Sequence, residues 1–449
     1  MRIKTDTALT LSHLARILDI KIDRDEEINA VTTDSRLCEN GDLFIALKGG
    51  RYDGSIFTDE AKKKNAFVLS ERADADLKVE SSEEALLKIA SSYKKAIEPR
   101  YRIAITGSVG KTTTKDFIHT ILSLKLKSHK TKENSNNIIG LSYTMLSAPR
   151  DTEALICEIG MNHTGEIDML SRALEPNIAV ITNIGSAHIG NLGSKECIAK
   201  AKLEIENGMT VGKTVIFKSE PLLAKAKNPY FISDREDFGD MFYRIDERRA
   251  DGTALFIKTK RIEGTFKTSL SSLHTVNSLL CAIAVSDIIG FTEDEIRSAL
   301  KRITEDQLRQ RVIKKNGYKF YDDSYNSSPE AVIANLKMLS ESKENISALL
   351  GDMLELGERS EELHRFIGKE CARYGIKKLY AFGRYAKFIA DGAMAEGMRK
   401  DSIFINESVS RPQITAEEIK SSYNGETILV KASHSLHAER IIELLTKEE

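Results

Sequence analysis

The segment from Ile103 to Thr114, IAITGSVGKTTT, joins a short apolar run to a glycine loop and then to a lysine and three threonines. Glycines let a backbone turn tightly and point N–H groups at an anion, and the following helix adds the positive end of its dipole. In this pattern Lys111 is placed to reach the outer phosphates of a nucleoside triphosphate, and Thr112 to ligate its Mg²⁺. The general motif has a glycine where Ile105 stands, so the match is to the shorter form TGxxGKTT. The alternative interpretation is an ordinary strand-to-helix turn rich in small residues.

Length and composition limit the classes of protein to consider. A chain of 449 residues predicts about three domains. Its 66 basic and 67 acidic residues give a net charge of −1, so no overall field draws it to nucleic acid or to an anionic membrane. The five cysteines are scattered singly, which favours a reducing compartment. No apolar leader and no apolar run of about 18 residues occurs, so we expect a cytoplasmic protein without membrane insertion.

Strand-like and helical stretches alternate along the chain, which predicts an α/β fold with mostly parallel sheets. A helix is expected over Ser82–Ile97, and a β-rich excursion over Tyr243–Lys267. Breaks near Pro99 and near Arg309–Arg311 predict domains over 1–99, 100–310 and 311–449. Strands are expected in the second and third domains at Ile103–Thr106, Ala154–Ile159, Ile178–Asn183, Thr214–Phe217, Lys319–Asp322, Ile346–Leu350, Lys378–Phe382, Ser402–Ile405 and Thr427–Val430.

Polar residues that directly follow apolar strands are candidate ligand contacts, because ligands of open parallel sheets bind at the carboxyl ends of the strands. Glu158 ends one such strand, and His188 follows another. The alternative to a ligand contact is that Glu158 caps a helix. For His188 the alternative is a structural role, which is the more common one for a single histidine. Lys202 lies in a helical stretch where an ordinary surface lysine is an equally good explanation.

Taken together, the motifs of this chain resemble those of the Mur ligase family, and they span nearly the whole chain in the family's order. The matching segments are Thr32–Arg36, Gly41–Leu47, Thr106–Thr114, Asn134–Gly140, Glu158–Asn162, Gly165–Ile167, Thr182–Gly185 with His188, Ala201–Lys202, Asp322–Asn326, Leu350–Gly357 and Leu429–Ser433. Within the family, the Asp322–Asn326 block, the Gly351–Gly357 block with His364, and the Asn134–Asn137 run resemble the members that add the dipeptide D-Ala-D-Ala.

The resemblance implies three domains: a smaller N-terminal α/β domain for a UDP-sugar, a central P-loop domain for ATP, and a C-terminal Rossmann-like domain. The last closes on ATP and binds the incoming dipeptide. The implied substrates are UDP-N-acetylmuramoyl-tripeptide and D-Ala-D-Ala. The implied reaction is amide ligation through an acyl phosphate, which yields a peptidoglycan precursor. The expected cofactors are ATP and two Mg²⁺, and the expected state is a monomer.

The resemblance also implies roles for individual residues. Lys111, His188 and Lys202 are the expected catalytic residues, and Thr112, Glu158, His188 and Lys202 the expected metal-side residues, with Lys202 N-carboxylated by CO₂. Carboxylation needs a neutral amine, which a desolvated setting favours. The expected nucleotide contacts are Gly107, Ser108, Val109, Gly110, Lys111, Thr112, Thr113, Asn137, Asn277, Arg311, Asp323, Tyr325 and Asn326.

Within that set, Asn137 and Asn277 match positions near adenine, Asp323 matches the ribose contact, and Arg311 matches an arginine that approaches the triphosphate on closure. For Arg311 an exposed linker charge is the alternative. The expected UDP contacts are Asp34, Ser35 and Arg36, where Arg36 is suited to pair with phosphate. Capping of a helix by Asp34 and Ser35 is the alternative there.

Several segments depart from the family pattern. Lys431-Ala432-Ser433-His434 replaces a Lys-Gly-Ser-Arg block, and Ser272–Thr275 differs from the usual Gly-x-His-Asn. These departures bear on acceptor choice more than on ATP chemistry. Two other functions therefore remain: a Mur-type ligase for a different amino acid, and a nucleotide-binding relative without catalysis. A nicotinamide dehydrogenase is disfavoured, because no GxGxxG follows the first strand.

Overall fold

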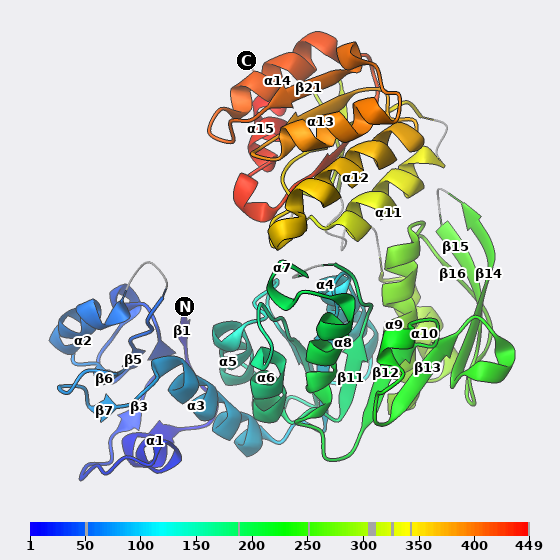
Figure 1. Ribbon diagram of the computed structural model, residues 1–449. Coiled ribbons are helices and arrows are strands. Elements are labelled where there is room, and N and C mark those ends of the chain that lie inside the picture. The colour runs from blue at the N-terminus through cyan, green and yellow to red at the C-terminus, as the bar shows by residue number, and fades with distance from the viewer. Residues whose placement is uncertain are drawn as a thin grey trace.

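The computed structural model describes residues 1–49, 53–186, 189–249, 252–303, 311–324, 327–341 and 344–447. Three bodies follow one another along the chain, and each is built around its own sheet (Figure 1). The expected α/β class is confirmed. Within the described residues, no helix combines the length and the apolar character that crossing a membrane requires.

The first body holds a five-stranded sheet in which only the edge strand β1 runs antiparallel to its neighbour. In sheet order its strands are β1 (Arg2–Ile3), β4 (Val31–Thr32), β5 (Leu43–Ile45), β6 (Phe67–Ser70) and β7 (Leu77–Lys78). Beside it lie the short antiparallel pair β2 (Leu9–Thr10) and β3 (Glu27–Ile28) and the helices α1 (Leu11–Leu18), α2 (Thr58–Lys63) and α3 (Ser82–Ile97).

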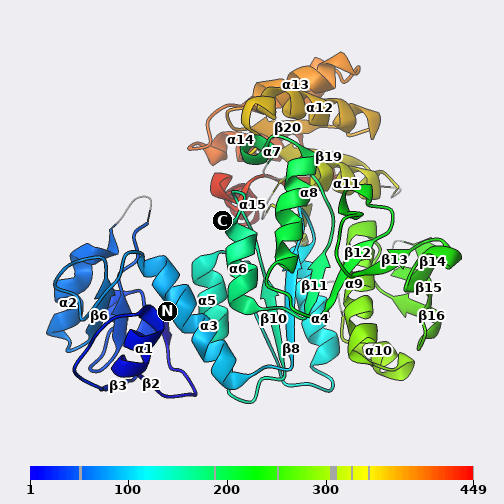
Figure 2. The ribbon, with the colours of Figure 1, turned by 60° about the horizontal axis from the view of Figure 1, so that its bottom comes forward.

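Helix α3 has the range that the sequence predicts. The Ser81 side chain accepts a hydrogen bond from the Glu84 N–H at its start, and Glu98 adopts a left-handed conformation at its end. The helix packs along the second body, where the Tyr93 hydroxyl donates to the carbonyl of Ala148. In Figure 2, α3 lies between the first body and α5.

The second body holds a nine-stranded sheet. Its order is β16 (Glu263–Thr268), β15 (Gly252–Lys258), β14 (Met241–Arg249), β13 (Pro229–Ser233), β12 (Lys213–Phe217), β11 (Ile178–Ile181), β8 (Tyr101–Thr106), β10 (Ala154–Glu158) and β9 (Ser128–Lys130). Its helices are α4 (Lys111–Leu122), α5 (Ile138–Leu146), α6 (Glu166–Leu174), α7 (Ile189–Leu192), α8 (Lys195–Leu203), α9 (Leu273–Ile289) and α10 (Glu293–Leu300).

Strand β8 lies between β10 and β11, and all three run parallel. The chain moves to one side of β8 for β9 and β10 and then to its other side for β11, so the order reverses at β8. A ligand crevice forms at such a reversal. The glycine loop follows β8 directly, which places it at this crevice.

Both faces of the central sheet are covered, so its strands are apolar throughout. Ile103 and Ile105 of β8 pack into the core formed with α4 and α9, while Ala104 belongs to the core on the opposite face. The predicted β-rich excursion is also confirmed, because β14, β15 and β16 pair antiparallel at one edge of the sheet.

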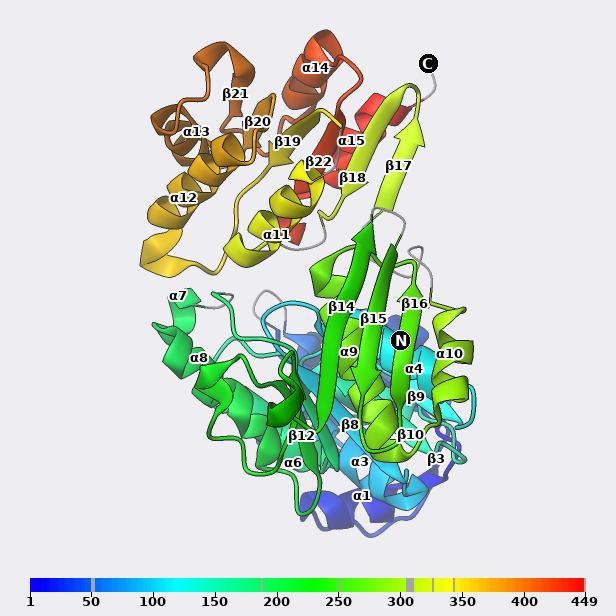
Figure 3. The same ribbon diagram turned by 90° about the vertical axis from the view of Figure 1, so that its right-hand side faces the viewer.

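The third body holds a six-stranded sheet in the order β17 (Arg311–Lys315), β18 (Tyr318–Asp322), β22 (Thr427–Lys431), β19 (Ile346–Leu350), β20 (Leu379–Phe382) and β21 (Ile403–Asn406). Only β17 is antiparallel to its neighbour. Its helices are α11 (Pro329–Ser340), α12 (Ser360–Arg373), α13 (Ala386–Ala395), α14 (Pro412–Ser422) and α15 (Glu439–Thr446). Figure 3 shows this body above the second, with α11 and the loop before α12 facing it.

Four histidines, of which His364 is buried and the others are half-buried, make the fold sensitive to acid. Burial and the nearby charge of Lys130 lower the pKa of His119 from 6.5 to about 4, and burial also lowers the pKa values of His129, His274 and His364. A lowered pKa in the folded state means that the unfolded chain takes up the proton first as the pH falls.

We therefore expect the free energy of unfolding to decrease between pH 6.5 and 4. His119 contributes about 1–2 kcal/mol of that loss at pH 5. Urea unfolding of the wild type and His119→Gln at pH 7.5 and pH 5 measures it, and the variant should lose less stability than the wild type. An equal loss in both proteins contradicts this assignment.

Candidate active site between the second and third bodies

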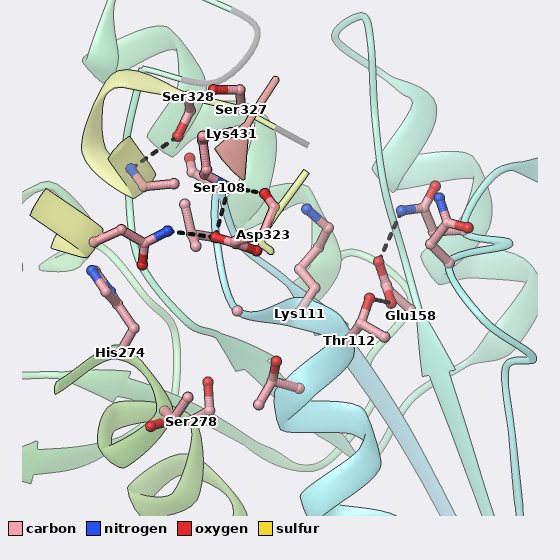
Figure 4. A pocket seen from close by; sticks show the side chains of 18 of the residues that line it. Ser108, Lys111, Thr112, Glu158, His274, Ser278, Asp323, Ser327, Ser328 and Lys431 are labelled. Carbon is pink, nitrogen blue, oxygen red and sulfur yellow. Dashed lines mark hydrogen bonds and ion pairs between the residues drawn. The ribbon is translucent and has the colours of Figure 1, made fainter. Parts of the chain in front are cut away.

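A cavity of about 190 Å³ lies between the glycine loop and the third body (Figure 4). Its residues from the second body are Ser108, Val109, Gly110, Lys111, Thr112, Thr113, Asn134, Asn136, Glu158, His274, Thr275 and Ser278. Those from the third body are Asp323, Ser327, Ser328, Ala331, Asn335, Leu354, Glu355, Leu356 and Lys431. The expected phosphate loop and the expected ribose residue Asp323 therefore line the same cavity.

The glycine loop has a backbone shape that favours glycine at both ends. Gly107 and Gly110 have φ of 150° and 84°, and a Cβ on Gly107 would lie 1.8 Å from Thr182 Oγ1. The loop is also tied to the end of β11. The N–H groups of Ser108 and Val109 both donate to Asn183 Oδ1, at 3.0 and 2.9 Å.

The second half of this loop leads into helix α4 without an intervening residue, because α4 begins at Lys111. The first N–H groups of a helix lack partners within the helix, and the helix dipole makes this end positive. Gly110, Lys111, Thr112 and Thr113 all line the cavity. This is the geometry of an anion site for the phosphates of a nucleotide.

Two lysines lie close enough to affect each other electrostatically. Lys111 Nζ donates to the carbonyl of Gly107 at 2.8 Å. Lys202, on α8, is 2% exposed, and its side chain makes no hydrogen bond or ion pair with any residue that the structure describes. Burial and the charge of Lys111 lower the pKa of Lys202 well below its ordinary value. This setting favours the neutral amine and excludes the alternative of a surface lysine.

A buried carboxylate faces the start of α4. Glu158, 1% exposed, accepts hydrogen bonds from Thr112 Oγ1 at 2.5 Å and from Asn136 Nδ2 at 2.9 Å. Hydroxyl and carboxylate oxygens are the ligands that Mg²⁺ prefers, so Thr112 and Glu158 fit the metal that the motif implies. Glu158 caps no helix, since it is the last residue of β10. Across the described ranges, no cluster of three or more His, Cys, Asp or Glu residues is arranged for a metal.

The third body contributes an ion pair to the opposite wall. Lys431 Nζ lies 2.8 Å from Asp323 Oδ2, which also accepts from Asn335 Nδ2 at 2.6 Å. His274 and Ser278 of α9, in the second body, also line the cavity. Sequence reasoning proposed Asp323 but did not propose Asn335, His274, Ser278 or Lys431 as nucleotide contacts.

The expected adenine contacts do not reach the cavity. Asn277 is exposed, whereas its helical neighbours Thr275 and Ser278 line the cavity. One residue turns a helix by about 100°, so the position next to a lining residue points elsewhere. Asn137 instead caps α5, where its side chain accepts from the Gly140 N–H at 2.9 Å. Asn277 is thus an exposed neighbour of the cavity wall and Asn137 caps α5, and contact of the two with adenine stays a prediction.

Four other predicted residues lie wholly or partly outside the described part of the chain. His188, Tyr325 and Asn326 fall outside it. Arg311 is described as a backbone position only, at the start of β17, where it pairs in register with Asp322. Arg311 is thus a strand residue, whereas a linker position was the alternative.

The expected UDP contacts lie in the first body, around a short 3₁₀ turn at Ser35–Leu37. Asp34 caps this turn and binds the Arg36 guanidinium with both carboxylate oxygens, at 2.8 and 2.7 Å. Hydrogen bonding to Arg36 lowers the pKa of Asp34 to about 2. Ser35 is buried and donates to Glu60 Oε2. The capping alternative holds for Asp34, while Arg36 remains exposed at the surface.

The Gly351–Gly357 block positions the cavity wall. Asp352 accepts from the N–H groups of Arg384 and Tyr385 at the start of α13, at 2.9 and 2.8 Å. His364 Nε2 accepts from the Met353 N–H at 2.9 Å, and Nδ1 bonds the Ser360 carbonyl. These bonds hold the segment that carries Leu354 to Leu356 into the cavity.

Comparison with known proteins agrees with this architecture. Three family models match the chain: "Mur ligase family, catalytic domain" over residues 27–104, "Mur ligase middle domain" over 105–286, and "Mur ligase, glutamate ligase domain" over 308–434. A curated relative, UDP-N-acetylmuramoyl-tripeptide–D-alanyl-D-alanine ligase of Bacillus subtilis, is 35% identical over 92% of each chain. The chain belongs to the Mur ligase family.

Other relatives of this Mur ligase carry the same name. The ligase of that name from Rickettsia prowazekii is 31% identical, with 96% of this chain and 98% of the relative covered. Among solved structures, MurF from Acinetobacter baumannii superposes with a TM-score of 0.88 at 25% identity, covering 98% of this chain and 99% of that one. MurF from Thermotoga maritima, solved in complex with ADP, has a TM-score of 0.81 at 28% identity, with 93% and 97% covered.

The crowding at Gly107 gives a test of the phosphate loop. Gly107→Ala places a methyl group against Thr182, so we expect nucleotide affinity to decrease at least tenfold and stability to decrease by roughly 1–3 kcal/mol. Calorimetric titration with ADP and thermal unfolding measure the two effects.

Gly425→Ala is the matched control. Gly425 has φ of 79°, but nothing lies within 4 Å of its Cβ position, so its replacement carries backbone strain without crowding the loop. It should lose some stability and keep its ADP affinity. Unchanged affinity in Gly107→Ala would contradict the assignment of the loop.

Proposed function

We propose that this Mur ligase joins D-Ala-D-Ala to the terminal carboxylate of UDP-N-acetylmuramoyl-tripeptide at the cost of ATP, in peptidoglycan precursor synthesis. The observation that carries the proposal is the cavity between the second and third bodies. There the glycine loop and the Thr112–Glu158 pair of the second body face the third body, and the buried Lys202 lies on α8 of the second body. The names of the relatives supply the substrates.

The chemistry explains why a triphosphate site is needed. A carboxylate is a poor electrophile, because its negative charge and resonance repel an amine. Transfer of the γ-phosphoryl group to a carboxylate oxygen gives an acyl phosphate and releases ADP. The amine of D-Ala-D-Ala then attacks the acyl carbon, and phosphate leaves from the tetrahedral intermediate as the amide forms.

Within this scheme, the loop backbone from Gly107 to Gly110 holds the phosphates, and Lys111 neutralises charge that spreads over the transferred group. Thr112 and Glu158 would hold Mg²⁺, which would supply positive charge beside the phosphates. His188 is proposed as the ligand of a second Mg²⁺. Asp323 is proposed at the ribose, and Arg36 at the diphosphate of the sugar nucleotide, once it leaves Asp34.

In this proposal each of the three bodies binds a different substrate. We assign the UDP-sugar to residues 1–99, ATP to residues 100–310 and the dipeptide to residues 311–449. Because the cavity has one wall from each of the last two bodies, closure of the third body completes the site and excludes the water that would hydrolyse an acyl phosphate. The enzyme is proposed to act as a monomer in the cytoplasm.

Substrate pairing tests the function. Phosphate release should require ATP, UDP-N-acetylmuramoyl-tripeptide and D-Ala-D-Ala together, and the product should gain the mass of the dipeptide less one water. Diaminopimelate and lysine tripeptides are assayed side by side. Turnover with single amino acids in place of the dipeptide would point to a different acceptor, and turnover with no amine would leave only nucleotide binding.

The buried amine of Lys202 gives a second test. We propose that CO₂ converts it to an anionic carbamate on the metal side of the site, because its lowered pKa favours the neutral amine that reacts with CO₂. Lys202→Ala should lose turnover by roughly 100-fold or more, and millimolar formate or acetate should restore part of it by replacing the carbamate.

Lys200→Ala is the control, since Lys200 lies on the same helix and is exposed. It should keep wild-type turnover and gain nothing from added carboxylates. If Lys202→Ala gains no activity with them either, the carbamate assignment fails.

A further inference from the structure

Glu330 binds the second body from the third, at a point outside the cavity described above. It lies in the first turn of α11, after the N-cap Ser328. Its Oε1 accepts from the N–H of Ser186 at 2.7 Å, and its Oε2 accepts from the Ser186 hydroxyl at 2.8 Å. Hydrogen bonds to an ionised carboxylate are stronger than neutral ones, and this carboxylate uses both oxygens on a single residue.

Ser186 ends a segment that supports the glycine loop. This segment, Thr182–Ser186, follows β11, and four of its contacts reach the loop. The Thr182 hydroxyl donates to the Val109 carbonyl at 2.6 Å, Asn183 Oδ1 accepts from two loop N–H groups, and the Gly185 N–H donates to Ser108 Oγ at 2.8 Å. Through hydrogen bonds at both its ends, this segment therefore connects the third body to the phosphate loop.

Gly185 packs closely against Ser108 on one side and against Glu330 on the other. A Cβ there would lie 3.1 Å from Ser108 Cβ and 3.3 Å from the Glu330 carboxyl carbon. Gly185 is thus held between the loop and the third body. A displacement of Glu330 acts on Ser108 through one residue, without passing through the nucleotide.

Other contacts between the two bodies have no such connection. Arg248 of β14 pairs with Glu341 at the far end of α11, at 2.5 Å. The Gly190 N–H donates to the Glu355 carbonyl, and the backbones of Gly190 and Gly357 pack closely against each other. Lys195 lies 3.6 Å from Glu330 but is half exposed, so this ion pair adds little.

We propose that Glu330 is a positioning residue for phosphoryl transfer, and this proposal rests on the proposed function. It makes the fit of the glycine loop depend on closure of the third body, through Ser186 and Gly185. Because Glu330 does not line the cavity, its loss should affect the rate of reaction in the closed enzyme and leave nucleotide binding nearly unchanged. Displacement of the phosphate by about 1 Å is enough to slow such a transfer.

The test compares kcat and ADP affinity in four variants of the full chain. Glu330→Ala should lower kcat roughly 10- to 100-fold and change the Kd for ADP less than threefold. Ser186→Ala should lose less, because its backbone N–H still binds Glu330. The double variant should equal Glu330→Ala alone, since both act through the same contact. Glu330→Gln should recover part of kcat, because its amide oxygen accepts one of the two hydrogen bonds.

Glu341→Gln is the control, because it weakens a contact between the same bodies that has no connection to the loop. It should keep kcat within twofold of the wild type. Equal losses in Glu341→Gln and Glu330→Ala would overturn the proposal, as would additive effects of Ser186→Ala and Glu330→Ala, or wild-type kcat in Glu330→Ala.

Hydrogen exchange in the ADP complex gives a readout that does not depend on the ligase reaction. The N–H groups of Ser108 and Val109 should exchange faster in Glu330→Ala than in the wild type, although neither contacts Glu330. Unchanged exchange there overturns the proposal. A wild-type enzyme that fails to use D-Ala-D-Ala would refute the proposed function and leave the exchange result to decide the role of Glu330.

Discussion

The hydrogen bonds that two backbone N–H groups make to Asn183 Oδ1 are the interaction on which the site depends. They fix the first half of the glycine loop against the end of β11, so that the second half leads directly into α4. Because β8 and β11 are neighbouring parallel strands, the loop and its support emerge at the same edge of the sheet. The sheet order thus places an anion site where the order reverses.

Charge in this protein is arranged locally. The chain is nearly neutral overall, yet two lysines approach each other beside the phosphate loop, and one of them is buried without a counter-charge among the described residues. Burying a cation costs free energy, and the cost falls when the amine gives up its proton. Nearby, Glu158 is satisfied by a hydroxyl and an amide. The second body therefore holds a buried amine that favours its neutral form and a hydrogen-bonded carboxyl group beside the phosphate loop.

The sequence predicted most of the fold because its strands are continuous apolar runs between turns. It missed β9, β13 and β17. Ser128–Lys130 is short, Pro229–Ser233 begins with a proline, and Arg311–Lys315 is mostly charged. It predicted the loop, Glu158 and Lys202, whose residue types follow from the chemistry of phosphate and metal. It did not single out the capping role of Asn137 at the start of α5, or Ser278, the neighbour of Asn277 that lines the cavity. The contacts of Glu330 depend on how two bodies dock, which no local pattern encodes.

Helix α3 begins in the first body and packs along the second, and this arrangement has a consequence for how the protein unfolds. Leu86, Ile89 and Tyr93 share one apolar core with Leu141 and Met145 of α5, and Lys94 is buried in an ion pair with Glu175. If α3 detaches, apolar side chains of both the first and the second body become exposed to solvent. We therefore expect the first two bodies to unfold as a single cooperative unit, and a truncation that removes the first body to leave an exposed apolar face on the second.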